Sequence, residues 1–544
     1  MTAAEQTRSL PRASYPEEVG VSSQAVLDLI NEFERQGMEL HSLMVLRHGK
    51  VAAECWRHPY AAEIPHAIYS CSKSVAGTAA GFAIDEGLFS MESKLHELFP
   101  EIKRRRQRVR YEKITVRHLL NMTAGLTLNV LLPKAGRDDW VGDFLRSRVK
   151  HEPGKVFHYA NEHAYLISVL IHRLTGQGLQ EYLRPRLFAP LGIDPFFWET
   201  DAQDREGGGW GICWKTEDSA KFMQCYLDGG KWDGRQVIPA WWVREATSPQ
   251  AQNPDNCKAD SRVGYGYQFW MCREPNTFAA RGMFCQQGVV MKDYDAVFVY
   301  TGADADEQKP FEVLYPHFPG GFVAQGDRPD PAVLAALREK IAGLTLPPPT
   351  ASPQRPPLEK ELSGETIRLR RQYFLNAVGL PSSLLSMVVN QLCYDKAGGI
   401  DDIRLRFGEN EGSFSWTEGR QSRKENTLPF GLDGSFREGA FSLSGFDFNA
   451  LSHARWLDDT TLRLHIRPKE SCSSRIYIFH FLGGRRVRIE QRTTPPLESI
   501  AENLAALSRQ FMNNNKIFHF FARKIFWLAP KLVEAPLRGR RKAK

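Results

Sequence analysis

A serine and a lysine stand three residues apart in the segment from His66 to Gly87, which reads HAIYSCSKSVAGTAAGFAIDEG. A serine hydroxyl is a weak nucleophile until a neighbouring base takes its proton. On a helix, residues at i and i+3 share one face with Cβ atoms about 5–6 Å apart, so the Lys73 amine can reach the Ser70 hydroxyl. Burial among the small residues that follow would depress the pKa of Lys73. This pairing predicts nucleophilic catalysis by Ser70 with Lys73 as its base.

A second motif, Tyr159-Ala160-Asn161, is the only Y-x-N in the chain. A tyrosine beside the pair can pass the proton on to a leaving group. The asparagine amide can hydrogen-bond both the lysine and a substrate carbonyl. The S-x-x-K spacing is weak evidence alone, because Ser147 to Lys150 repeats it among charged residues. The prediction therefore depends on the combination with Tyr159 and Asn161.

Hydrophobic periodicity predicts the elements that must position these residues. Strands are expected near both ends of the first 345 residues, in a hairpin over residues 41–56 and in runs at 265–271 and 288–302. Helices are expected between and after them, at 70–86, 114–126, 161–175 and 330–344. Strands from both ends of a segment imply one antiparallel sheet with a helical insertion, an α+β fold. The run GGGWG at 207–211 is expected to turn near the site.

Residues 346–544 have sequence patterns that differ from those of the first 345 residues. Residues 346–362 are rich in proline and are predicted to be a linker. Short β-like runs separated by turn signals predict an all-β accessory domain, a sandwich or small barrel, over residues 363–494. Residues 495–544 are expected to form a basic, aromatic-containing helical tail.

Residues 15–345 resemble the serine β-lactamase and penicillin-binding protein superfamily, because several blocks occur in the expected order. These are LMVLRHGKVAAE, YSCSKSVAGTAAGFAIDEG, TVRHLLNMTAGL, YAN, DSAKFMQCYLDGGKWDG and GYGYQFW. The likeness is to the class-C-like branch of esterases, D-amino peptidases and enzymes similar to 6-aminohexanoate-dimer hydrolase. It implies a β-lactamase-like fold, with Ser70 acylated, Lys73 and Tyr159 as the general base and acid, and Asn161 positioning substrate.

The third motif of that superfamily is altered. A lysine or histidine usually precedes x-Gly on the strand that lines the site, and the best-aligned block here gives Ala280-Arg281-Gly282. Arg281 is adjacent, but neighbouring strand residues point to opposite faces. Gly282 and the backbone N–H of Met283 are expected to complete an oxyanion hole. The altered motif argues against recognition of a β-lactam carboxylate and leaves acyl transfer intact.

The sequence gives little support for other classes of protein. The fifteen histidines form no metal-binding motif, and a G-x-S-x-G elbow is absent, so no metal or cofactor is predicted. The basic runs lack interleaved aromatics, which argues against nucleic acid as a partner, although the tail could contact a membrane peripherally. Scattered cysteines and the lack of a signal segment favour the cytoplasm. The oligomeric state is left open.

The sequence therefore predicts a serine hydrolase that cleaves a small ester or amide. Three alternatives stay open: a non-catalytic binding protein that keeps the fold, an acyltransferase, and a β-lactam-processing enzyme.

Overall fold

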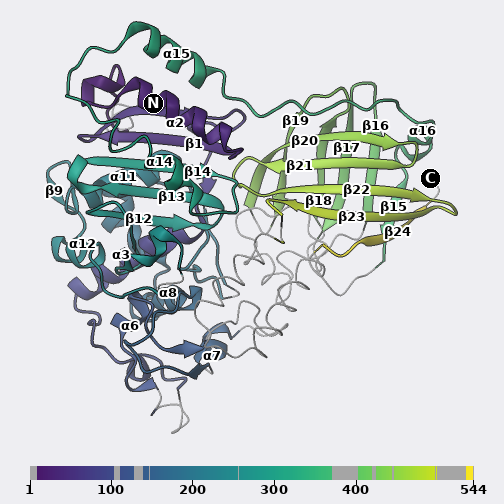
Figure 1. Cartoon of the computed structure of the whole chain (residues 1–544). Coiled ribbons are helices and arrows are strands. Elements are labelled where there is room, and N and C mark those ends of the chain that lie inside the picture. The colour runs from purple at the N-terminus through teal and green to yellow at the C-terminus, as the bar shows by residue number, and fades with distance from the viewer. Residues whose placement is uncertain are drawn as a thin grey trace. The chain divides into compact units, whose positions relative to one another are not determined.

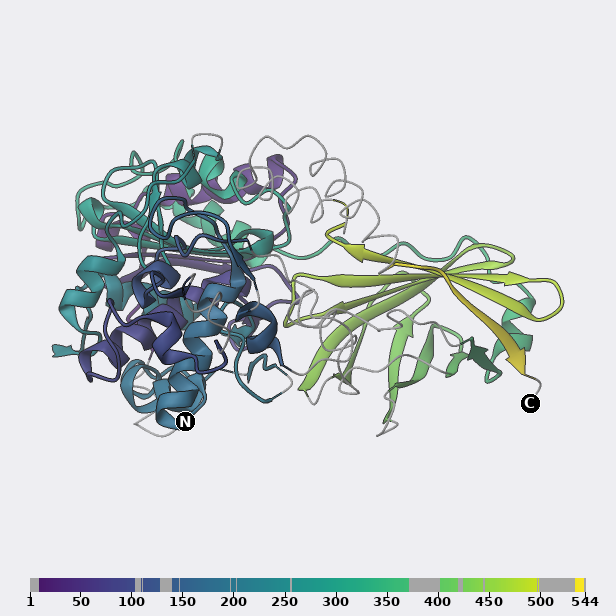
Figure 2. The same cartoon turned by 90° about the horizontal axis from the view of Figure 1, so that it is seen from below.

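The computed structural model of the chain forms two compact units, divided between Thr345 and Leu346. Each unit has its own sheet and its own buried core (Figures 1 and 2). The residues that the structure describes are 9–102, 109, 111–127, 139–145, 147–195, 197–201, 203–254, 257–370, 402–418, 424–443, 446–496, 498 and 534–542.

The first unit is built on a seven-stranded antiparallel sheet in the order β10-β11-β12-β13-β14-β1-β2. Strand β1 lies beside β14, with Val45 opposite Phe298, so the two ends of the unit meet in the middle of the sheet. The prediction of one antiparallel sheet built from both ends is confirmed. The strands are β1 (Leu40–Arg47), β2 (Lys50–Trp56), β10 (Gly264–Tyr265), β11 (Trp270–Met271), β12 (Thr277–Gly282), β13 (Gln286–Met291) and β14 (Ala296–Gly302).

Helices cover both faces of this sheet (Figure 1). One face packs against α2 (Ser23–Arg35), α14 (Lys309–Leu314) and α15 (Pro331–Ala342). Helix α2 begins where the Ser22 side chain accepts a hydrogen bond from the Ala25 amide, and its buried apolar residues recur at helical spacing. The other face packs against α11 (Thr216–Leu227) and α3 (Ser72–Asp85).

Helix α3 is buried on every side, with twelve of its fourteen residues inside the unit. Its small residues let neighbours come close: a Cβ at Gly81 would lie 2.4 Å from the Trp242 ring. Gly87, with φ +73°, follows the helix and ends it as predicted. The close packing keeps water away from the first turn of α3, where Lys73 lies.

The first unit has further helices, most of them short. They are η1 (Pro16–Val19), η2 (Tyr69–Cys71), α4 (Leu95–Leu98), α6 (Val116–Leu120), α7 (Trp140–Leu145), α8 (Asn161–Thr175), α9 (Leu179–Leu183), η3 (Arg184–Phe188), α10 (Ala189–Leu191), α12 (Ala240–Ala246), α13 (Ala259–Arg262), η4 (Met283–Cys285) and η5 (Lys292–Tyr294). Short strands complete it: β3 (His66–Ala67), β4 (Leu126–Thr127), β5 (Arg148–Val149), β6 (Phe197–Trp198), β7 (Ile212–Trp214), β8 (Lys231–Trp232) and β9 (Arg235–Gln236).

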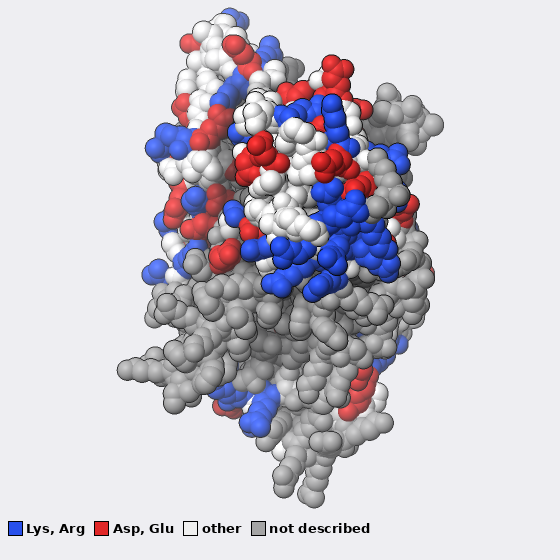
Figure 3. Space-filling view, turned by 90° about the vertical axis from the view of Figure 1, so that its right-hand side faces the viewer, with Lys and Arg blue, Asp and Glu red and all other residues white. Residues whose placement is uncertain are grey.

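The second unit is a ten-stranded sheet in the order β18-β17-β16-β15-β24-β23-β22-β21-β20-β19. A bridge from Gly431 to His453 also joins β18 to β20, so the sheet curls back on itself like a barrel. Lys and Arg side chains gather on part of its surface (Figure 3). The strands are β15 (Thr366–Leu369), β16 (Asp402–Phe407), β17 (Glu411–Glu418), β18 (Lys424–Gly431), β19 (Arg437–Leu443), β20 (Phe446–Asp458), β21 (Thr461–Pro468), β22 (Ser474–Leu482), β23 (Arg486–Thr494) and β24 (Leu537–Lys542).

Two segments of this unit differ from expectation. A short helix, α16 (Leu358–Leu362), forms inside the predicted linker. Strand β24 lies in the predicted helical tail and pairs with both β15 and β23. Its buried residues alternate with arginines, a period of two that belongs to a strand and not to a helix. The aromatic part of the tail, residues 511–530, lies outside the described residues. No helix in the described part of the chain is long and apolar enough to cross a bilayer.

Candidate active site

Ser70 lies in η2, the 3₁₀ turn that leads directly into α3. The residue before it, Tyr69, has φ +48°, a strained conformation for an aromatic residue. Backbone strain of this kind persists only where the surrounding structure enforces it, and it is common at functional sites. The turn leaves Ser70 partly exposed while Lys73 is only 1% exposed. Ser70 is therefore accessible, whereas Lys73 is shielded from solvent.

Three acceptors surround the Lys73 ammonium. Its Nζ donates to Ser70 Oγ at 2.9 Å, to Asn161 Oδ1 at 2.6 Å and to the Gly209 carbonyl at 2.6 Å. Burial nevertheless lowers the pKa of Lys73 from its ordinary value of 10.5 to about 7. Near neutral pH a substantial fraction of Lys73 is thus the free amine, which can accept the Ser70 proton.

Tyr159 packs beside this pair. Its ring centroid lies 4.8 Å from Lys73 Nζ, and Trp270 contacts the ring from the sheet side at 5.2 Å. Burial raises the pKa of Tyr159 well above its ordinary value, although a hydrogen bond with Ser70 acts in the opposite direction. The phenol therefore keeps its proton and is suited to donate it, while Lys73 is suited to accept one.

A glycine turn delivers the third acceptor of Lys73, as the sequence led us to expect. Gly208 has φ +62°, and a Cβ there would lie 2.5 Å from the Ala164 carbonyl. A Cβ at Gly209 would lie 2.8 Å from the Asn161 carbonyl. The turn thus packs directly on the first turn of α8, and this close approach brings the Gly209 carbonyl to Lys73.

The end of β12 approaches the nucleophile turn equally closely. A Cβ on Gly282 would lie 2.3 Å from the carbonyl oxygen of Ile68, two residues before Ser70. Only glycine allows this approach without displacing the strand. Met283, whose backbone amide is expected to be the second donor of an oxyanion hole, is the next residue in the chain.

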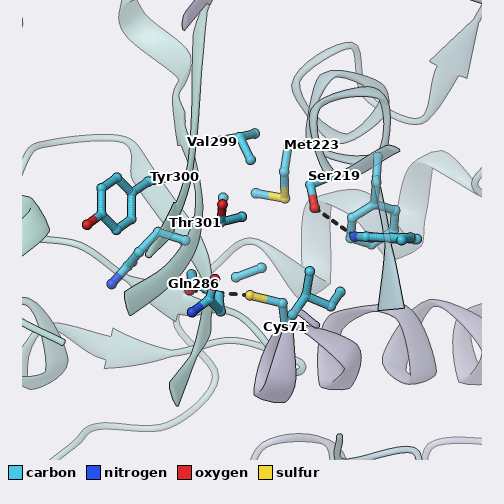
Figure 4. A pocket seen from close by; sticks show the side chains of 13 residues that line it. Cys71, Ser219, Met223, Gln286, Val299, Tyr300 and Thr301 are labelled. Carbon is cyan, nitrogen blue, oxygen red and sulfur yellow. Dashed lines mark hydrogen bonds between the residues drawn. The ribbon is translucent and has the colours of Figure 1, made fainter. Parts of the chain in front are cut away.

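Ala280 and Arg281 point to opposite faces of β12. Ala280 faces α11 and lines a small interior cavity with Cys71 and Met223, whose side chains appear in Figure 4. Arg281 is 4% exposed and donates to Ser261 Oγ at 2.9 Å and to the Glu307 carbonyl at 3.1 Å. The described contacts of Arg281 therefore brace the turn that carries Glu307.

Two carboxylates near the site were missed by sequence reasoning. Glu162 follows Asn161 directly and is 3% exposed, and Glu307 is a partly exposed residue of the turn after β14. The charge of each acts to raise the pKa of Lys73 against the effect of burial. Glu162 adjoins the Y-x-N motif, which was an available signal. Glu307 lies in an acidic loop, ADADEQ, with no motif to single it out.

Replacing Gly282 by alanine should reduce turnover more than stability. The added Cβ must push β12 away from Ile68 and so shift the Met283 amide from the oxyanion position. Loss of one oxyanion-hole donor costs about 10²–10³ in kcat, so we expect kcat to fall within that range with a small change in KM. Steady-state kinetics with a chromogenic ester would measure this. Gly320→Ala, at an exposed glycine with open space around its Cβ, is the matched control. Unchanged kcat in Gly282→Ala would contradict this role for the β12 edge.

Several known proteins are similar to this chain. The family model for beta-lactamases matches residues 29–315. The 6-aminohexanoate-dimer hydrolase of Paenarthrobacter ureafaciens is 26% identical over 255 residues, 42% of this chain and 64% of that protein's length. A penicillin-binding protein homologue from Caulobacter crescentus is 16% identical with a TM-score of 0.46, covering 55% of this chain and 99% of its own. The D-amino acid amidase of Ochrobactrum anthropi is 17% identical with a TM-score of 0.43, covering 54% and 98%.

Proposed function

The chain belongs to the beta-lactamase family, and on that premise we propose that it is a serine hydrolase that cleaves a small ester or amide through an acyl-enzyme on Ser70. The observation that carries the proposal is the 2.9 Å hydrogen bond between a buried Lys73 amine and the Ser70 hydroxyl. The depressed pKa of that amine, about 7, makes it a base at neutral pH.

The reaction would proceed in two halves. Neutral Lys73 takes the Ser70 proton as Oγ bonds to the substrate carbonyl carbon, and the backbone amides of Ser70 and Met283 hold the resulting oxyanion. The Tyr159 phenol gives its proton to the departing alcohol or amine, which leaves an ester on Ser70, and the proton on Lys73 restores the phenol. Water then attacks the acyl-enzyme by the reverse sequence of proton transfers and releases the acid.

The residue at position 280 narrows the substrate class. Ala280 stands where this superfamily usually carries a lysine or histidine, and it lines an interior cavity, so this position supplies no cation for a β-lactam carboxylate and β-lactam processing is the less favoured alternative. The name of the relative from Paenarthrobacter ureafaciens makes linear amides the first compounds to test beside short esters. We place the enzyme in the cytoplasm, which is supported by eight described cysteines that are all free thiols.

Covalent labelling is the experiment that tests the proposal. The purified full chain is incubated with a serine-directed fluorophosphonate and with a short-chain nitrophenyl ester, while intact mass and colour are followed. We expect one adduct, located by peptide mapping to the segment that contains Ser70, together with ester turnover. A protein that neither labels nor turns over would be a binding protein that has kept the fold. Faster product formation with added alcohol would indicate acyl transfer.

The charge of Glu307 should be visible in the pH dependence of this reaction. Lys73 must be neutral to act as base, so kcat/KM is expected to rise as the pH increases through about 7. Because the Glu307 charge holds the pKa of Lys73 up, Glu307→Gln should move that rise to lower pH. Glu312→Gln, at an exposed residue of α14, is the control that should leave the profile in place. A profile unmoved by Glu307→Gln would show that Glu307 does not act on Lys73.

A further inference from the structure

The outer face of three neighbouring strands in the second unit is strongly basic. On β15, β24 and β23, buried residues alternate with exposed ones, and the exposed positions carry almost only cations. Figure 3 shows Lys and Arg side chains gathered on this side of the unit. We call this the arginine face, and it consists of Arg368, Arg370, Arg486, Arg488, Arg538 and Arg540.

The strand register aligns these arginines in two rows across the strands. In the first row Arg540 lies opposite Arg368 on one side and opposite Arg486 on the other. In the second row Arg538 lies opposite Arg488, and its carbonyl accepts a hydrogen bond from the Arg370 amide. Side chains directly opposite each other across strands have Cβ atoms about 4.5–5.5 Å apart, and like charges so placed are destabilising. The fold therefore keeps an arrangement that is unfavourable by itself.

Little on these three strands neutralises the charge. Among their described residues on this face, Glu490 is the one carboxylate, and it lies 3.3 Å from Arg488 and 3.6 Å from Arg492. The Nε of Arg486 donates to the Gly483 carbonyl and not to an acid. Beyond the two rows, Arg492 and Lys542 add further exposed cations. The six guanidinium groups therefore stand beside two carboxylates, Glu490 and, opposite Arg368 on the neighbouring strand β16, Asp402.

We propose that the arginine face binds the surface of an anionic phospholipid membrane. Guanidinium groups pair bidentately with phosphate oxygens, and a cluster of this size is typical of proteins that recognise acidic lipid headgroups. The rows lie on the outside of a sheet, where side chains at regular spacing can meet many headgroups at once. The sequence just before β24 in the chain, KIFHFFARKIFWLAPK, mixes aromatic and basic residues as interfacial segments do.

Nucleic acid fits this face less well. Sheets that bind single strands stack bases on aromatic side chains, and the exposed residues of β15, β24 and β23 include none. Reading a duplex requires an element that enters a groove, whereas these arginines project from the middle of paired strands. The two rows of arginines are instead complementary in charge to a broad anionic surface.

The experiment compares vesicle binding by the full chain and its variants. Phosphatidylcholine vesicles with and without phosphatidylserine are sedimented with the wild type and with two triple variants. The face variant is Arg486→Gln/Arg538→Gln/Arg540→Gln. The matched control replaces three exposed arginines of the first unit, Arg184→Gln/Arg235→Gln/Arg244→Gln. Removing three cations from the face should weaken binding to the phosphatidylserine vesicles about a hundredfold, and the control should bind like the wild type. Arg486→Lys/Arg538→Lys/Arg540→Lys keeps the charge, so it should bind more tightly than the glutamine variant but less tightly than the wild type, because an ammonium group cannot pair bidentately with a phosphate.

Activity, lipid composition and salt give further tests of the proposal. Circular dichroism and thermal unfolding of the face variant should match the wild type, which shows that the second unit is folded. Ester turnover on Ser70 in the first unit should be unchanged, and failure of the hydrolase proposal would leave the vesicle result intact. Binding should require phosphatidylserine and should weaken as salt is added. Equal loss in the face and control variants would overturn the proposal, because net charge and not this face would then drive binding. Binding of random-sequence DNA without binding of vesicles would also overturn it.

Discussion

Ser70→Ala is expected to lower kcat/KM by about 10⁴-fold or more on any ester or amide that the protein hydrolyses. The methyl group cannot form the acyl-enzyme, and no second hydroxyl replaces it, because Ser72 is occupied by hydrogen bonds to the Tyr69 carbonyl and the Ile212 amide. Fluorophosphonate labelling should disappear together with turnover. The substitution removes one hydroxyl from a partly exposed position, so the fold should be preserved.

The sequence itself supplies the control. Ser147 stands three residues before Lys150 and repeats the S-x-x-K spacing. The structure places it after α7, away from any helix start, and Arg148 and Val149 between the two residues form the short strand β5. Ser147→Ala should label and turn over like the wild type. Labelling of the Ser70→Ala variant at the wild-type rate would mean that another serine is the nucleophile.

The sequence predicted most of the first unit because its signals are local. The hairpin of β1 and β2, the end of α3 at Gly87 and the end of α8 at Gly176 each depend on glycine or alternation over a few residues. The pairing of β1 with β14 followed from where strands occur along the chain. The meeting of Ser70, Lys73 and Asn161 came from motif and family resemblance, and the hydrogen bonds agree with it.

What the sequence did not predict depends on contacts between distant segments. The charge of Glu307 reaches Lys73 only because Arg281 and Gln287 both donate to the Glu307 carbonyl and hold its turn against the sheet. Strand β24 was missed because its alternation spans six residues of which four are basic, which reads as a solvated tail. Its partner β15 is more than 160 residues earlier, so local pattern could not reveal the pairing.

The Lys73→Met variant should show the contribution of Lys73 to catalysis separately from the effect of its burial on the stability of the fold. Without a base, kcat/KM is expected to fall about 10²–10⁴-fold, and fluorophosphonate labelling of Ser70 should slow in parallel. Lys73→Arg should be equally impaired, because a guanidinium does not give up its proton at neutral pH. Lys231→Met, at an exposed lysine of the same unit, should keep full activity. An active Lys73→Arg enzyme would show that Lys73 supplies charge and not basicity.

The same variant tests the depressed pKa of Lys73 without any substrate. Between about pH 7 and 10.5 the unfolded chain binds a proton at Lys73 that the folded chain has released. The wild type should therefore gain stability relative to Lys73→Met as the pH rises through that window, by at most about 1.4 kcal/mol per pH unit. Below pH 7 both states hold the proton and the difference should become constant. Hydrogen exchange of the α3 amides, measured at several pH values, reports on the unit that contains Lys73. A difference between the two proteins that stays constant across the window would place the pKa of Lys73 near its ordinary value, and a different group would then have to serve as the base.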